Sequence, residues 1–119
     1  MKNSSSGIID KARFENYIST FLSIVGENIR YFRQLKGMSQ EELVKKSGIS
    51  RDVLSRIENG KNISLDNLLI IAKALGIEPW ALLITKEKRN IFETFLKELS
   101  ERTNILERLS AIEKKLNIK

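Results

Sequence analysis

The chain has 119 residues, and its 21 lysines and arginines outnumber its 15 aspartates and glutamates to give a formal charge of +6. It contains neither cysteine nor histidine, which excludes disulfides, thiolate metal sites and imidazole-based catalysis or zinc binding. The length suits one small domain with an extension, and the positive charge favours a polyanionic partner. We therefore expect no enzyme, no cofactor and no metal.

The first residues of the chain are polar, and we expect no secretory signal there. Residues 1–7 are polar, unlike a secretory signal, and no apolar run approaches the length of a membrane span. A cytoplasmic protein without membrane contact is the default expectation. Apolar residues then recur at helical spacing from Ile8 to Ile24. We expect residues 1–24 to form a flexible start and an extra amphipathic helix, which either completes the core or contacts a second copy.

Residues 39–60 predict two short helices joined by a tight turn. Ser39, followed three residues later by Glu42, forms a capping box that begins the first helix. Gly48 supplies the left-handed backbone with which many helices end, and Ser50 caps the second helix. The apolar residues of that second helix share one face, so its polar residues point outward. Such a helix pair can insert side chains into the major groove of DNA.

Three further helices are expected around this pair, within residues 25–85. One precedes the pair, and another begins after the capping residue Ser64, with Leu65 and Leu69 among its core residues. The last begins at Pro79, where proline suits the first helical turn. Because every expected element is a helix, the predicted fold class is all-α.

The same region resembles the helix-turn-helix domain of phage repressors and Cro proteins, the xenobiotic-response-element (XRE) family. The residues that carry the resemblance are Gln40, Leu43, Gly48, Ile49, Ser50, Leu54, Ser55, Ile57, Glu58, Asn59 and Gly60. The likeness extends from Ile24 to Leu83 and departs from the family at Val44, where a small alanine is usual. It implies a five-helix lambda-repressor-like DNA-binding domain over residues 25–85, with the extra N-terminal helix before it and a C-terminal helical extension after it.

The resemblance implies roles for individual residues on double-stranded DNA. The residues that would read base edges are Ser50, Arg51, Asp52, Ser55 and Arg56. Those that would contact phosphates are Ser39, Gln40, Asn59, Lys61 and Asn62. Arg33 and Glu58 would form a structural ion pair between the first and third helices. Arginine suits guanine O6 and N7, whereas Asp52 either accepts from cytosine or orients a neighbouring arginine, and we favour the orienting role.

The tail, residues 86–119, lies beyond the minimal family domain and carries two apolar stripes at helical spacing. The residues expected to form a dimer interface are Phe92, Phe95, Leu99, Ile105, Leu109, Ile112 and Leu116. Asn104 and Glu107 resemble a helix cap, so the tail is either a helical hairpin or one continuous helix. Folding back onto its own domain is the alternative to an interface.

These features favour a sequence-specific transcriptional regulator, in the simplest case a repressor, that acts as a homodimer. Two motifs related by a two-fold axis would meet successive major grooves about 34 Å apart and favour a near-palindromic operator. A restriction–modification controller is a variant of this hypothesis. The alternative is an antitoxin-type interaction protein that binds DNA through the domain and a protein partner through the tail.

Overall fold

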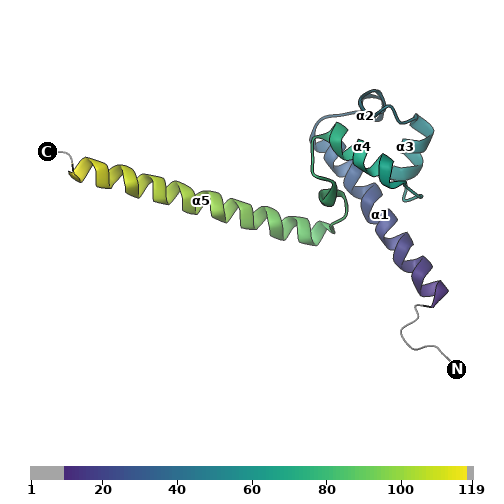
Figure 1. Ribbon diagram of the computed structural model, residues 1–119, viewed down its shortest axis with the longest axis horizontal. Coiled ribbons are helices and arrows are strands. Elements are labelled where there is room, and N and C mark those ends of the chain that lie inside the picture. The colour runs from purple at the N-terminus through teal and green to yellow at the C-terminus, as the bar shows by residue number, and fades with distance from the viewer. Residues whose placement is uncertain (1–9, 118–119) are drawn as a thin grey trace. The chain divides into compact units, whose positions relative to one another are not determined.

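The computed structural model describes residues 10–117, in which every regular element is a helix (Figure 1). The elements are α1 (Lys11–Leu35), α2 (Gln40–Ser47), α3 (Arg51–Glu58), α4 (Leu65–Leu75), the 3-10 helix η1 (Pro79–Leu82) and α5 (Lys86–Asn117). The all-α class is therefore confirmed, while residues 1–9 of the predicted start lie outside the described part. The chain divides into two compact units between Ile84 and Thr85. Within the described residues, no helix combines the length and the apolar character needed to cross a bilayer.

α1 is a single helix where the sequence favoured two. It begins after Asp10, whose side chain accepts a hydrogen bond from the Ala12 amide at 3.1 Å, and continues without a break to Leu35. Gly26 is the weakest point of the helix, at a cost of about 1 kcal/mol relative to alanine. A Cβ atom at Gly26 would lie 2.5 Å from the carbonyl oxygen of Ile57. The missing side chain thus lets α1 pack directly on α3.

The central helix pair begins and ends at its predicted caps. The Ser39 hydroxyl accepts from the Glu42 amide at 3.1 Å, and the Glu42 carboxylate accepts from the Ser39 amide at 2.9 Å. The hydrogen bond from the Ser39 amide, followed by the interaction with the Ser39 side chain, lowers the pKa of the Glu42 carboxyl group. α2 ends at Gly48, whose φ of 75° is the left-handed conformation that glycine adopts most easily. α3 begins at Ser50, whose hydroxyl accepts from the Val53 amide at 3.3 Å.

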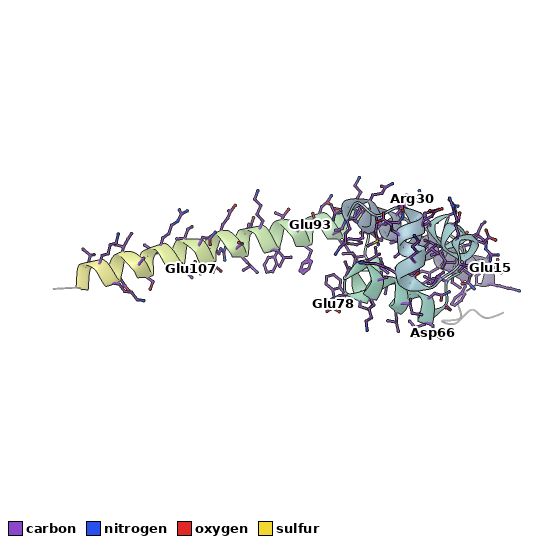
Figure 2. The ribbon with its side chains drawn as sticks, turned by 90° about the horizontal axis from the view of Figure 1, so that it is seen from above. Glu15, Arg30, Asp66, Glu78, Glu93 and Glu107 are labelled. Atoms are coloured by element: carbon purple, nitrogen blue, oxygen red, sulfur yellow. The ribbon has the colours of Figure 1, made fainter. Side chains whose placement is uncertain are left out.

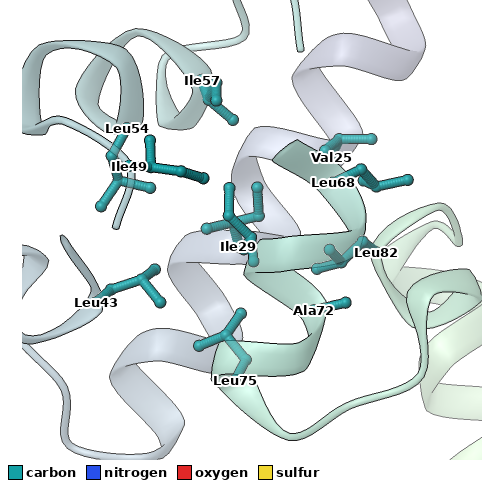
Figure 3. Close-up of a cluster of buried hydrophobic side chains, with 11 residues drawn as sticks. Val25, Ile29, Leu43, Ile49, Leu54, Ile57, Leu68, Ala72, Leu75 and Leu82 are labelled. Atoms are coloured by element: carbon teal, nitrogen blue, oxygen red, sulfur yellow. The ribbon is translucent and has the colours of Figure 1, made fainter. Parts of the chain in front are cut away.

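The helices of the first unit enclose one hydrophobic core (Figure 3). α1 packs against α3, α4 and η1, while α2 packs against α3 and α4. The buried residues are Val25, Ile29, Leu43, Ile49, Leu54, Ile57, Leu68, Ile71, Ala72, Leu75 and Leu82. Leu65 and Leu69 are 68% and 45% exposed, so their prediction as core residues is wrong. α4 carries apolar residues around most of its circumference, and only one of its faces can point inward.

The fifth helix of the domain is a short 3-10 turn, η1, rather than an α-helix. Leu82 anchors it in the core. The buried side-chain amide of Asn28 on α1 donates to the carbonyl oxygens of Leu82 at 2.9 Å and Ile84 at 2.7 Å. These bonds satisfy two backbone acceptors and fix the end of the domain to α1.

α5 is one continuous helix of 32 residues, so the hairpin alternative is wrong. Asn104 and Glu107 lie inside it and not at a helix start. The segment between the apolar stripes contains no glycine or proline, and the Thr103 hydroxyl donates back to the Leu99 carbonyl oxygen at 3.0 Å, which the helix accommodates. Thr85 caps the helix by accepting from the Lys88 amide at 3.2 Å. Figure 2 draws the side chains that project from α5, Glu93 and Glu107 among them.

Candidate nucleic-acid interface

The outward face of α3 is polar, and its inward face is fixed in the core. Leu54 and Ile57 are buried, which holds the helix in one orientation on α1 and α2. On the other side, Arg51, Asp52 and Arg56 are exposed and Ser55 is half-buried. Asp52, Ser55 and Arg56 line a shallow hollow on this surface. The structure therefore brings four of the five predicted base-reading side chains onto one accessible face, with Ser50 at its start as the helix cap.

Arg51 is held by an acidic residue that the sequence analysis did not single out. Its Nη1 lies 3.0 Å from Oε1 of Glu41 on α2, and the two side chains are 65% and 68% exposed. Glu41 therefore holds Arg51 here, while the orienting role that was favoured for Asp52 stays a prediction. An ion pair this exposed contributes little to stability, about 0–1 kcal/mol, so the Arg51 guanidinium can leave it at small cost. The pairing joins two helices, and no local spacing reveals it.

A buried carboxylate ties three helices together behind this face. Glu58 on α3 accepts from Nε of Arg33 at 2.8 Å and from Nη2 at 3.0 Å, so the expected pair is present in a bidentate form. Nε2 of Gln40 on α2 donates to the same carboxylate at 3.0 Å, and Nη1 of Arg33 donates to the Met38 carbonyl oxygen at 2.9 Å. The Glu58 side chain is only 1% exposed, and the network fixes α3 relative to α1 and α2.

Two opposing effects set the acidity of Glu58. Burial raises the pKa of its carboxyl group, but the hydrogen bonds from Arg33 and Gln40, with the charges of Arg33 and Arg30, outweigh burial and hold the pKa below its ordinary value. The group is therefore an ionised structural anchor at neutral pH and lacks the raised pKa of a general acid.

Several predicted phosphate contacts also have structural partners within the chain. Ser39 is the α2 cap and Gln40 is bonded to Glu58. The Asn59 side chain donates to the Ser55 carbonyl oxygen at 2.9 Å at the end of α3. Lys61 and its neighbour Asn62 are exposed in the following loop. The roles of all five on DNA stay predictions.

Arg30 is a further cation at this site that the sequence analysis missed. Its Nη2 donates to the Glu58 carbonyl oxygen at 3.2 Å and lies 3.5 Å from Oδ1 of Asn59. The side chain is 43% exposed, so it combines a contact to the end of α3 with access to solvent. Its position three residues before Arg33 on one helix face was the available signal.

All seven residues expected to form an interface are exposed on the single helix α5. They range from Phe92, 36% exposed, to Leu116, 74% exposed. Their role in dimerisation stays a prediction.

Comparison with known proteins assigns the family. Residues 29–79 match the helix-turn-helix domain family. The chain is 38% identical over 68 residues to the "hypothetical transcription factor" of Neisseria meningitidis, spanning 56% of this chain and 64% of that protein. It is 44% identical over 62 residues to control protein C.BamHI of Bacillus amyloliquefaciens, spanning 50% and 76%. The crystal structure of the restriction-modification controller protein C.AhdI from Aeromonas hydrophila superposes with a TM-score of 0.50 at 44% identity, covering 51% of this chain and 94% of that one. The chain therefore belongs to the XRE-type helix-turn-helix family of DNA-binding transcriptional regulators.

Proposed function

We propose that the protein is a cytoplasmic, homodimeric repressor that reads a near-palindromic operator through the major groove and acts by binding alone. The observation that carries the proposal is the α3 face, where Arg51, Asp52 and Arg56 are exposed on a helix whose other side is anchored by the Glu58 network. Two such helices related by a two-fold axis would read half-sites one helical turn, or a multiple of one, apart.

The proposal divides the site into side chains that read bases and side chains that fix position. Phosphate contacts set the register on the duplex, and base contacts set sequence preference. We assign base reading to the α3 face and phosphate binding to the first turn of α2 and the loop after α3, with Lys61 at its centre. Arg30 joins the second group because its exposed guanidinium lies beside Asn59.

Replacing Arg51 with alanine should weaken binding to the preferred site by about 1–3 kcal/mol and binding to random DNA much less, because a bidentate guanine contact is lost. Fluorescence anisotropy titrations of both DNAs at one salt concentration measure this. The Glu41→Ala variant is the matched control, since it removes the ion pair but keeps the guanidinium. Equal losses on the two DNAs for Arg51→Ala would reduce this residue to a phosphate contact.

The variant Lys61→Ala should weaken binding to every sequence and flatten the slope of log K against log salt by about one unit, because one phosphate contact and its released counterion are lost. The slope comes from titrations at four or five salt concentrations. Lys114→Ala removes the same charge from α5 and should leave the slope unchanged. A lost sequence preference with an unaltered slope would contradict the assignment.

An antitoxin-type protein that holds a partner on α5 is the second candidate. It is favoured by the apolar side chains that α5 exposes, and by the position of α5 outside the matched residues 29–79. Sedimentation of the purified chain separates the candidates. A dimer supports the homodimeric repressor, whereas a monomer whose α5 is stabilised only by a second protein supports the antitoxin.

A further inference from the structure

We propose that α5 pairs with the α5 of a second copy in antiparallel orientation, and that Arg102 and Glu113 select this orientation and its register. The inference rests on the proposed homodimer and specifies the interface within it.

The seam of α5 is a heptad pattern interrupted by two charges. The seam is the face of α5 on which residues recur at alternating steps of three and four. Its residues are Phe92, Phe95, Leu99, Arg102, Leu106, Leu109, Glu113 and Leu116. Six of these positions are apolar, and all of them are exposed within α5. Arg102 and Glu113 are equally exposed, and neither forms an ion pair with any described residue. A partner that covers the seam must therefore also satisfy one positive and one negative group.

A parallel pair in register does not satisfy them. Each seam residue would face its own counterpart, which places Arg102 against Arg102 and Glu113 against Glu113 in a partly dehydrated interface. Both contacts repel, and neither charge gains a partner.

An antiparallel pair does satisfy them. Seam residues alternate between the a and d positions of the heptad, and reversing one helix brings each a position opposite a d position of the other helix. With Arg102 opposite Glu113, Leu99 faces Leu116 and Leu106 faces Leu109, and each layer occurs twice by symmetry. Every charge in the seam then has an opposite charge facing it. Sliding the helices by one heptad would instead place Arg102 opposite Leu106 and leave all of the seam charges without a partner.

The residues beside the seam support the same register. Ile105 and Ile112 lie on one flank, where antiparallel pairing brings Ile105 of one helix beside Ile112 of the other. These isoleucines widen the apolar contact beyond the seam itself. Thr103 and Ser110 meet in the same way on the opposite flank, where their short polar side chains leave room for close packing.

This pairing sets the distance between the starts of the two α5 helices. The two-fold axis passes between residues 107 and 108, so at 1.5 Å per residue the two Thr85 residues that begin α5 are held about 68 Å apart.

Charge exchange in the full-length chain tests the pairing, with dimer dissociation constants measured by sedimentation equilibrium. Arg102→Glu and Glu113→Arg should each weaken the dimer by about tenfold or more, because each places like charges opposite one another. The double variant Arg102→Glu/Glu113→Arg restores opposite charges and should return to within about threefold of the wild type. Arg108→Glu changes a charge away from the seam and should have no effect. Circular dichroism verifies equal helicity.

Orientation is measured directly by disulfide formation, since the chain has no cysteine of its own. Leu99→Cys chains mixed with Leu116→Cys chains should cross-link to each other, whereas Leu99→Cys alone should not, because antiparallel pairing separates the two Leu99 positions by about 26 Å. Cross-linking of Leu99→Cys with itself, or a dimer without rescue in the double variant, would overturn the orientation but leave the homodimer intact. A monomeric wild-type chain would overturn both.

Discussion

Truncation after Thr85 is expected to leave a folded, mainly monomeric domain that binds the operator at least about a hundredfold more weakly. The hydrophobic core lies entirely within the first unit, so removing α5 leaves it intact. One domain reads only a few base pairs, whereas in a dimer the second domain binds at the high effective concentration set by the first. Sedimentation measures the oligomeric state, circular dichroism the helical fold and titration the operator affinity, all on the same preparation.

The full-length chain with Arg102→Glu is the matched control, because it should weaken the dimer by about tenfold or more without losing the helix. If the truncated domain stays a tight dimer, the interface lies within the domain, and Trp80, 48% exposed, is the first residue to examine. α5 would then have another purpose, and a search for its protein partner would follow.

Replacing Arg33 with alanine is expected to destabilise the domain by about 3–5 kcal/mol, because it leaves the buried Glu58 carboxylate without its bidentate partner. Gln40 and Arg30 still face Glu58 and should place the loss near the lower end of that range. Urea unfolding of the variant and the wild type measures this loss in the free energy of unfolding. Arg51→Ala breaks an exposed pair and is the control, with an expected loss of less than about 1 kcal/mol. Equal losses for the two variants would contradict the structural role.

The same pair makes stability depend on pH. Because the pKa of Glu58 is lowered by folding, its contribution is fully present above the ordinary glutamate pKa of about 4.3 and is lost as the pH falls through the lower folded value. Glu58→Gln should be less stable than the wild type at neutral pH, and this difference should shrink on acidification. A difference that stays constant would show that folding does not lower the pKa of Glu58.

The sequence predicted the features of the fold that depend on neighbouring residues. Ser39, Ser50 and Ser64 each cap the helix that follows, as expected, because a capping hydrogen bond spans only three residues. The continuity of α1 was not predicted and that of α5 was left open, since amphipathic segments and cap-like pairs look the same whether or not the helix continues through them. Gly26 in α1 is tolerated because of its contact with α3, which only the folded structure shows.

The sequence predicted which residues form the α3 face, but it did not predict which side chains from other helices contact them. The residues of the α3 face follow from the helical period and the family resemblance. Three polar partners were missed because they come from other elements of the fold: Glu41 beside Arg51, Arg30 beside Asn59 and Asn28 beside η1. Of these, only Arg30 had a signal in the sequence, its helical spacing from Arg33. The hydrogen bond from Gln40 to Glu58 was also not predicted, while the role of Gln40 on phosphate stays a prediction.

The central claim is that α3 reads DNA sequence, and selection of bound DNA from a random pool tests it most directly. The full-length protein and its Arg51→Ala variant are selected in parallel at the same salt concentration. The wild type should enrich a near-palindromic site, and the variant should lose the preference for guanine at one position in each half-site. A wild-type pool no different from the starting pool, or the same guanine enriched by both proteins, would contradict the account.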